Sequence, residues 1–312
     1  MGIHCCCSQR DLSRILPSVG LCKNPALSKS YTMDITVVIA AKNEEANLPE
    51  CLASVRWAKQ VLVIDSGSTD GTESITKEYG AEYHLFQYDG TWPKKRNWAL
   101  KAGIVTQPWV LILDADERVS DELKSAMEKA ISRQDVDGYY LKWKFTFLGQ
   151  WMKHSWSHGW MLRLFRYGKG EYENLHMTNE GGWDAEVHEN IVVDGPCEKL
   201  APLLDHDSNS SLFYWIKKQN EFSTWNAERR RQQLSQPVPS LAHLFSGDPV
   251  KIRKWMKSVF IRLPGKPFLM FLWLYVIKGG FLDGKAGFYF CCLRAGHELN
   301  ICAKLFEKKI PD

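Results

Sequence analysis

The sequence predicts an α/β fold in which helices cover a doubly wound, mostly parallel sheet. Three short runs of β-branched and other apolar residues are typical of buried parallel strands: Ile35–Ala40, Val61–Ile64 and Trp109–Leu113. Segments with apolar residues at helical spacing separate these runs. Strands that alternate with helices in this way indicate crossover units and therefore a parallel sheet.

The elements follow one another in a regular order up to residue 147. We expect a further strand and four helices in this part, at 82–88 and at about 46–58, 72–79, 94–102 and 121–131. Residues 139–147 then alternate as in an antiparallel strand, whereas 150–200 have no clear period. From about Ser211 the pattern is helical again.

Composition places the chain among ordinary folded proteins. Its 312 residues are 45% hydrophobic and 24% charged, so a sizeable core can form. A net charge of only +4 gives no reason to expect nucleic acid as a partner. Nine cysteines without a CxxC pair indicate reduced thiols in a cytosolic protein. Residues 1–32 lack the apolar run of a secretory signal, and we expect them to form a flexible extension.

The C-terminal part combines apolar and basic residues. Ten consecutive apolar residues occupy Phe268–Ile277, about half of the roughly 20 that a membrane-spanning helix needs. From Lys251 to Asp312 there are 12 Lys or Arg and 4 Asp or Glu. This composition predicts an amphipathic segment at about 264–297 that lies on a membrane surface. The alternative is a helical hairpin that only packs on the main domain.

The triplet Asp114-Ala115-Asp116 stands directly after the buried run Trp109–Leu113. In a doubly wound sheet, ligands bind outside the carboxyl ends of the strands. Two carboxylates there can hold Mg²⁺ or Mn²⁺ against a diphosphate, because these ions prefer oxygen ligands and share their coordination shell with phosphates. The triplet therefore predicts a metal and phosphate site.

A second acidic residue, Asp65, follows the run Val61–Ile64 and opens a segment rich in glycine and serine. A carboxylate in this place can accept a hydrogen bond from the N–H of a nucleobase, while the glycines let the backbone turn closely around a ligand. For Asp70 and Thr72 a cap of the next helix is the better interpretation. Asp65 is thus the candidate for a nucleoside contact.

Taken together, the motifs resemble glycosyltransferase family 2, whose fold is known as GT-A. The resemblance covers about 33–200 and rests on four segments in the family's order: Ala40–Glu45, Asp65–Thr72, Lys95–Asn97 and Asp114–Asp116. Three further segments resemble the branch of the family that builds lipopolysaccharide core: Arg163–Arg166, Val187–Glu189 and Gly280–Gly284. We accordingly expect a catalytic domain at 33–210 and a helical region at 211–312 that associates with the membrane.

The resemblance implies inverting transfer of a hexose from a nucleotide-sugar, a UDP-sugar in the first place. The acceptor would be a lipid-linked or lipopolysaccharide-type glycan, at the cytoplasmic face of the plasma membrane. The donor site would be lined by residues at the carboxyl ends of the strands: Ala40, Ala41, Glu44, Asp65, Arg96, Asp114, Ala115 and Asp116. His188 would join Asp114 and Asp116 at the metal.

Inverting transfer also needs a base for the acceptor hydroxyl. Glu189 is the first candidate because it stands in the Val-His-Glu segment, followed by Glu186 and Asp184. The polar segment 169–183 is a candidate lid. Several tryptophans and arginines are candidates for contacts with the acceptor. Each tryptophan could instead pack in the core, and each arginine could instead pair with nearby acids: Trp151, Trp156, Trp160, Arg163 and Arg166.

Three other classes of protein remain as alternatives. A nucleotidyltransferase would normally carry a glycine-rich basic loop after the first strand, where this chain has Ala40–Glu45. An inactive carbohydrate-binding or scaffold protein would not need the acidic and basic motifs to be intact. A phosphohydrolase would usually place its Asp-x-Asp after the first strand, whereas here it follows the fourth.

Overall fold

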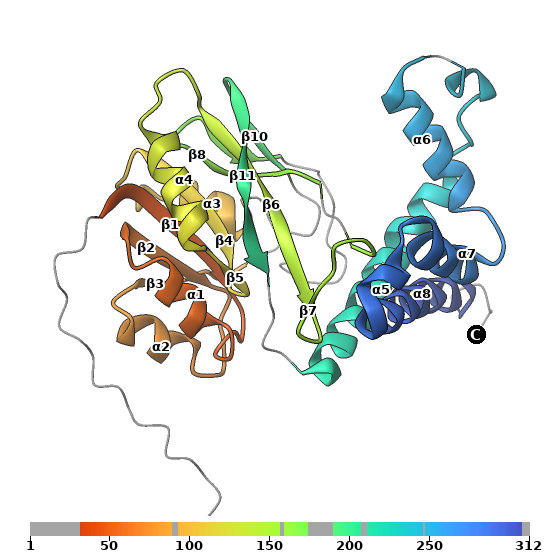
Figure 1. The fold of residues 1–312 in the computed structure, drawn as a ribbon, viewed down its shortest axis with the longest axis horizontal. Helices are drawn as coiled ribbons and strands as arrows, with labels where there is room; N and C mark the ends of the chain where they lie inside the picture. Colours follow the sequence, from red (N-terminus) through yellow and green to blue (C-terminus); the bar gives the residue numbers. More distant parts are fainter. Residues whose placement is uncertain are drawn as a thin grey trace, which may run out of the picture. The chain divides into compact units, whose positions relative to one another are not determined.

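The computed structural model describes residues 32–88, 93–156, 159–173, 190–206, 211–245 and 247–307. Thr32–Asp312 forms one compact unit, within which a sheet with flanking helices is followed by a helical C-terminal part (Figure 1). The expected extension at 1–32 lies outside the described residues, apart from Thr32 itself.

The first half of the sheet is parallel and confirms the strands expected from the sequence. Its strands stand in the order β3-β2-β1-β4, and every neighbouring pair is parallel. Their bounds are β1 Met33–Ala41, β2 Ala58–Asp65, β3 Glu82–Leu85 and β4 Trp109–Asp114. All four carboxyl ends therefore meet at one edge of the sheet.

The second half of the sheet is mixed, so the doubly wound parallel pattern holds for part of the sheet only. Here the order is β4-β8-β6-β11-β5, in which β6 and β11 are parallel and the other neighbours antiparallel. These strands are β5 Glu117–Arg118, β6 Gly138–Phe147, β8 Met161–Arg166 and β11 Cys197–His206. A short β7 (Gln150–Trp151) pairs with β6, and β9 (Gly170–Tyr172) pairs with β10 (Ile191–Val193). Strands β7 to β11 were not expected, because their side chains do not alternate cleanly.

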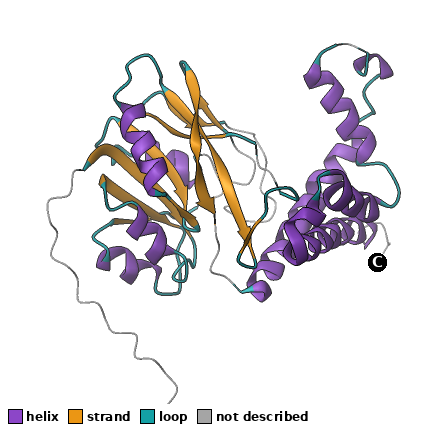
Figure 2. Ribbon diagram, in the orientation of Figure 1, coloured by secondary structure: helices purple, strands orange, loops and turns teal. Residues whose placement is uncertain are grey.

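Helices cover both faces of the sheet (Figure 2). They are α1 Leu48–Ser54, α2 Thr72–Glu78, α3 Lys95–Lys101 and α4 Asp121–Ile131. Alternate residues of β1 face opposite layers, with Val37 packed among α1 and α4 side chains and Val38 among α3 side chains. Helix α4 begins where Ser120 accepts a hydrogen bond from the Leu123 N–H. This two-sided burial explains why the strands are apolar throughout.

The C-terminal part consists of helices and short helical turns. They are α5 Leu212–Ser235, η1 Leu241–His243, α6 Pro249–Phe260, α7 Lys266–Leu272, the π-helical η2 Trp273–Ile277, the 3₁₀ turn η3 Gly280–Asp283 and α8 Gly284–Glu307. In the described part of the chain, no single helix is long and apolar enough to cross a membrane. Lys266–Ile277 and Gly280–Glu307 meet the length and hydropathy criteria only as a pair, with a bend of 74° between them. We call this bent pair the C-terminal hairpin.

Candidate donor and metal site

Strand register gathers several of the predicted site residues at the carboxyl edge of the parallel strands. Ala40 lies beside Asp114 of β4, and Ala41 lies beside Asp65 of β2. Ala41 is buried, whereas Ala40 is partly accessible. Ala115, the middle residue of the triplet, is buried. The sequence therefore placed these residues correctly at one edge, and their contacts with a donor stay predictions.

The carboxylate of Asp65 accepts hydrogen bonds from groups within the protein. It is fully buried and accepts hydrogen bonds from the Ser68 N–H at 2.7 Å, from the Ser68 hydroxyl and from the Tyr83 hydroxyl at 2.8 Å. Burial and the hydrogen bond to Asp65 raise the pKa of Tyr83 to about 12. Asp65 thus holds the β2–α2 loop in shape, and its predicted contact with a nucleobase stays a prediction.

The β1–α1 loop is tied to the β2–α2 loop by side chains that cap backbone groups. The Glu44 N–H donates to Thr72 Oγ1 at 3.0 Å, and the Thr69 N–H donates to Asn43 Oδ1 at 2.9 Å. Asn43 adopts a φ of 54°, a region that asparagine tolerates better than most residues. The Glu44 side chain accepts from Asn47 at 2.7 Å, and burial raises the pKa of Glu44. These contacts keep a protonatable group near the carboxylates of the triplet.

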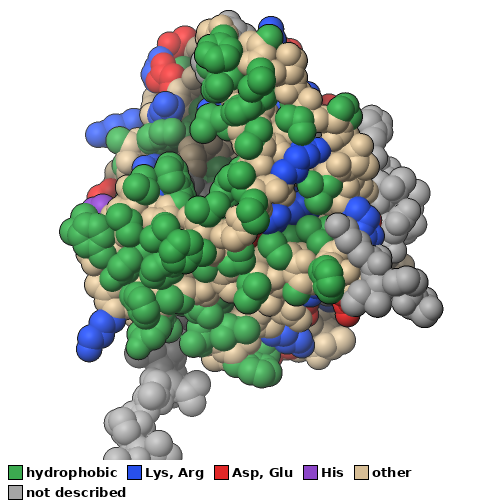
Figure 3. Space-filling model, turned by 90° about the vertical axis from the view of Figure 1, so that its right-hand side faces the viewer, with side chains coloured by type: hydrophobic (Ala, Val, Ile, Leu, Met, Phe, Trp, Pro, Cys, Tyr) green, Lys and Arg blue, Asp and Glu red, His purple; other side chains and the backbone are tan. Residues whose placement is uncertain are grey.

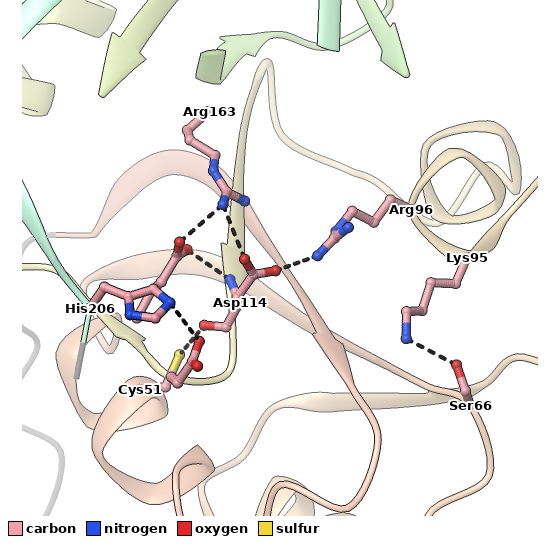
Figure 4. A network of polar contacts seen from close by, with 9 residues as sticks. Cys51, Ser66, Lys95, Arg96, Asp114, Arg163 and His206 are labelled. Atoms are coloured by element: carbon pink, nitrogen blue, oxygen red, sulfur yellow. Dashed lines mark hydrogen bonds and ion pairs between the residues drawn. The ribbon is translucent and has the colours of Figure 1, made fainter. Parts of the chain in front are cut away.

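Asp114 is held by two guanidinium groups, one on each carboxylate oxygen (Figure 4). Arg96 of α3 pairs with Oδ1, and Arg163 of β8 pairs with Oδ2 at 3.1 Å. Burial would raise the pKa of Asp114, but the two arginines outweigh it and hold this pKa well below its usual range. Asp114 is therefore an ionised and firmly oriented carboxylate.

Glu117 completes this network from below the triplet. It is fully buried, accepts the Asp114 N–H at 2.8 Å and pairs with Arg163 at 3.0 Å. Burial raises the pKa of Glu117. The Arg163 guanidinium also lies 5.4 Å from the centre of the Trp143 ring. Of the two interpretations that the sequence left open for Arg163, ion pairing with nearby acids is the one observed.

Asp116 points to a different partner, His206 at the end of β11. Nε2 of His206 lies 3.6 Å from Oδ1 of Asp116. The antiparallel pairing of β11 with β5 places His206 beside Glu117, one residue after Asp116. The imidazole packs against Trp143 at 4.7 Å and Phe145 at 5.5 Å between ring centres. Its Nδ1 atom is buried without a hydrogen-bond partner among the described residues.

Sequence reasoning did not single out His206, and its choice of His188 as a metal ligand stays a prediction. His188 and the three candidate bases Asp184, Glu186 and Glu189 lie outside the described residues, and so does most of the expected lid. A signal for His206 was present in the sequence. The apolar pair Leu203-Leu204 is followed by Asp205 and His206, which is the pattern of a strand that ends at a polar site. Only the pairing of β11 with β5 shows that this strand end lies beside the triplet.

The donor set fits a divalent cation that is shared with a phosphate ligand. An imidazole and a carboxylate suit Mn²⁺, and such ions commonly keep several positions for substrate oxygens and water. Within the described ranges no three His, Cys, Asp or Glu side chains gather around one metal-sized position. Both oxygens of Asp114 already face guanidinium groups. Asp116 faces His206 instead, and the predicted metal contacts of Asp114 and Asp116 stay predictions.

Two lysines add positive charge to the same edge. Lys95 of α3 donates to the Ser66 hydroxyl at 3.1 Å (Figure 4). Partial desolvation by neighbouring groups lowers the pKa of Lys218 on α5, but the charges of Asp116 and Glu44 outweigh this effect and raise the pKa. A cation from α5 was not expected from the sequence, because α5 is far from the triplet in the chain. Together with Arg96, these groups surround the acids with charges that suit a diphosphate.

The structure gives different surroundings to the three tryptophans that are candidates for acceptor contacts. Trp156 packs in a small core with Phe145 at 5.7 Å and Phe290 at 5.5 Å between ring centres. Trp151 and Trp160 are each 37% exposed, and lysine side chains lie over both rings. Packing is therefore the observed role of Trp156, while an acceptor contact of the other two stays a prediction.

The parallel half-sheet, the Asp-x-Asp triplet at its carboxyl edge and the matches to known proteins define the class. The family model described as glycosyl transferase family 2 matches residues 36–183. An uncharacterized glycosyltransferase of Rickettsia typhi is 33% identical over 200 residues, which are 62% of this chain and 67% of that protein. The chain belongs to glycosyltransferase family 2.

Within this family, a relative is similar over almost the whole chain. The lipopolysaccharide core biosynthesis glycosyltransferase LpsC of Rhizobium meliloti is 25% identical over 290 residues, which are 88% of this chain and 93% of the relative. Among solved structures, the mannosyltransferase PcManGT from Pyrobaculum calidifontis in complex with GDP-Man and Mn²⁺ gives a TM-score of 0.42, with 17% identity and 92% of each chain covered.

Proposed function

We propose that this chain is an inverting, metal-assisted glycosyltransferase that moves a hexose from a UDP-sugar to a lipopolysaccharide-type or lipid-linked glycan at the cytoplasmic membrane surface. The observation that carries the proposal is the pair Asp116 and His206, 3.6 Å apart, beside an Asp114 that two arginines hold in place. The acceptor class draws on the similarity to the lipopolysaccharide core biosynthesis glycosyltransferase of Rhizobium meliloti.

The residues around the triplet have different proposed roles in binding the donor. Asp116 and His206 would hold Mn²⁺ or Mg²⁺, which when bound neutralises the charge on the departing diphosphate. Asp114, ionised and oriented, is suited to accept hydrogen bonds from ribose hydroxyls. Arg96 and Lys218 supply positive charge toward the phosphates, and Glu44 lines the nucleoside side.

The transfer step requires a base on the acceptor side. A carboxylate takes the proton from the acceptor hydroxyl while its oxygen forms a bond to C1 of the sugar. The bond between C1 and the diphosphate oxygen breaks on the opposite face, and the nucleoside diphosphate leaves with the electron pair. Glu189, Glu186 and Asp184 remain the candidates for this base in that order.

The exposed side chains of the C-terminal hairpin are the basis for proposing membrane association. Hydrophobic side chains gather on the face that Figure 3 presents, with few charged groups among them. Large apolar residues of the hairpin are strongly exposed, among them Phe268 at 66%, Trp273 at 51% and Ile277 at 67%. Soluble surfaces rarely expose contiguous apolar patches of this kind, and the cations of α6 suit anionic lipid headgroups.

Calorimetric titration tests the donor site. UDP, GDP and dTDP would be titrated with Mn²⁺ and with EDTA into the wild type, Asp116→Ala and the control Asp121→Ala, which changes an exposed acid of α4. We expect one nucleotide to bind only with metal, and this binding to be lost in Asp116→Ala alone. Folded wild type that binds none of the nucleotides would overturn the proposal in favour of a carbohydrate-binding scaffold.

The stereochemical outcome is tested separately. When the donor that binds is supplied with a candidate acceptor, the anomeric configuration of the product can be read by NMR. Inversion at C1 supports the single-displacement step, whereas retention contradicts it. Release of inorganic pyrophosphate from a nucleoside triphosphate and a sugar phosphate would instead identify a nucleotidyltransferase.

A further inference from the structure

The bend of the C-terminal hairpin carries the segment Gly280–Gly284, to which the donor chemistry assigns no role. Turn η3 fills most of it and ends at Asp283. The Asp283 side chain is only 2% exposed, although its neighbours Phe281 and Leu282 are 52% and 60% exposed. A buried carboxylate between exposed apolar residues needs a polar partner, since an unpaired buried charge is strongly unfavourable.

Asp283 finds its partners in the catalytic part of the chain, on the segment that follows β7. It accepts hydrogen bonds from the backbone N–H groups of Lys153 at 3.1 Å, His154 at 3.2 Å and Ser155 at 2.8 Å. The Ser155 hydroxyl donates to it at 2.7 Å, and Nδ1 of His154 lies at 2.9 Å. One carboxylate thus satisfies three consecutive N–H groups through charge-assisted bonds.

Glycines let the hairpin close tightly around this carboxylate. A Cβ atom on Gly287 would lie 2.6 Å from Cβ of Asp283, and one on Gly280 would lie 2.7 Å from the Leu274 carbonyl oxygen. Neither distance is tolerated between real atoms, so both positions require glycine. The close approach of α8 to η3 is therefore built into the sequence of this bend.

Next to the Asp283 contact, α8 packs directly on the sheet. The Phe290 ring lies 5.6 Å from the Phe145 ring and 5.3 Å from the Phe147 ring of β6. Phe145 in turn contacts His206, the proposed metal ligand, at 5.5 Å between ring centres. The hairpin is consequently joined to the catalytic part in two places: Asp283 binds the segment after β7, and Phe290 packs on β6, whose Phe145 contacts His206.

We propose that Asp283 is a positioning residue that locks the membrane-contacting hairpin to Lys153–Ser155 and thereby sets the position of the donor site relative to the bilayer. The proposal rests on the membrane association proposed above. Its chemical requirement is a carboxylate with two acceptor oxygens, because an amide in the same place replaces one acceptor with a donor that faces N–H groups.

The test uses the full chain with vesicles of phosphatidylcholine alone and with phosphatidylglycerol added. The variants are Asp283→Asn, Asp283→Ala in case the milder change is too weak, and the control Asp194→Asn, which changes an exposed aspartate. Vesicle binding is measured by flotation, and hydrogen exchange reports on the amides of Lys153–Ser155. Energy transfer from a fluorescent UDP analogue bound with Mn²⁺ to a labelled lipid reports the distance of the donor site from the bilayer.

We expect Asp283→Asn to bind vesicles and the UDP analogue as the wild type does. Its amides at Lys153–Ser155 should exchange about tenfold faster or more, because the substituted amide keeps only one acceptor oxygen for the three N–H groups, and its energy transfer should change on vesicles. Exchange and energy transfer equal to the wild type in both Asp283 variants would overturn the lock. Wild type that fails to bind any vesicle but still binds UDP would overturn the membrane association on which the lock rests, while leaving the donor site intact.

Discussion

Nε2 of His206 lies 3.6 Å from Oδ1 of Asp116, and the pairing of β11 with β5 holds the two side chains in that position. If they bind the same cation, His206→Ala should weaken the Mn²⁺-dependent binding of UDP by at least about tenfold. In EDTA, UDP should bind neither the wild type nor His206→Ala. Calorimetry measures both, with His84→Ala on β3 as the control. Equal affinities in Mn²⁺ for wild type and His206→Ala would remove His206 from the metal site.

Arg163 is buried between two acids, and its removal should be costly. Arg163→Met leaves Asp114 with one arginine and Glu117 without its ion pair, so we expect a loss of about 3–5 kcal/mol in the free energy of unfolding. The double variant Arg163→Met with Glu117→Leu should recover much of it, since it buries no unpaired charge.

Arg133 provides the control for this experiment, because its ion pairs with Asp135 and Glu198 are on the surface. Arg133→Met should cost far less than Arg163→Met, because exposed ion pairs contribute little to stability. Urea unfolding of the four proteins gives the comparison. Equal losses for Arg163→Met and Arg133→Met would contradict a buried network.

Two glycines of α8 give a matched pair for the packing of the C-terminal hairpin. Gly287→Ala should destabilise it, because the new Cβ would lie 2.6 Å from Cβ of Asp283. Gly296→Ala, in the same helix, meets nothing within 4 Å and should stabilise by up to about 1 kcal/mol. Thermal unfolding distinguishes the two. If both substitutions shift the unfolding temperature in the same direction, helix propensity and not close packing determines the effect of the substitution at Gly287.

Acid should weaken the contact between α5 and α8 through His297. Burial, together with the nearby Arg294, lowers the pKa of His297 to about 4, and its Nδ1 lies 3.1 Å from the Gln219 carbonyl oxygen of α5. In the unfolded chain the same group titrates near 6.5. The stability that depends on a neutral His297 is therefore complete above about pH 6.5 and declines as the pH falls toward 4.

We expect this decline to amount to about 1–2 kcal/mol after allowance for solvent screening. Urea unfolding of wild type and His297→Gln at pH 7.5 and pH 4.5 measures it, and the variant should lose less stability between the two values. His84→Gln, on the edge strand β3, is the control. A variant with the same pH dependence as the wild type would assign the acid sensitivity to other groups.

Much of the parallel half-sheet was predictable because its information is local. Runs such as Val61–Ile64 must be buried on both faces, and the two-sided packing of β1 confirms the reason. Helix α4 was predicted at the observed bounds, since Ser120 and the apolar period mark its start and course. The position of Asp114 and Asp116 at a carboxyl edge follows from the direction of parallel strands alone.

The second half of the sheet could not be predicted in the same way. Its strands pair across long stretches of chain, and β11 even shifts register along β6. Which residues meet then depends on packing and hydrogen bonding between distant segments, and local alternation carries little of that information. For this reason Asp116 was found and its partner His206 was not.

By itself, the sequence determined the α/β class, the edge at which the acids gather and the family. Tertiary structure decided what each charged group faces: Arg163 faces Asp114 and Glu117, Asp65 faces its own loop, and Asp283 faces the backbone after β7. The physical reason is that strand and helix periods act over a few residues. An ion pair or a buried carboxylate is instead stabilised by whichever distant groups the completed fold brings within hydrogen-bonding distance.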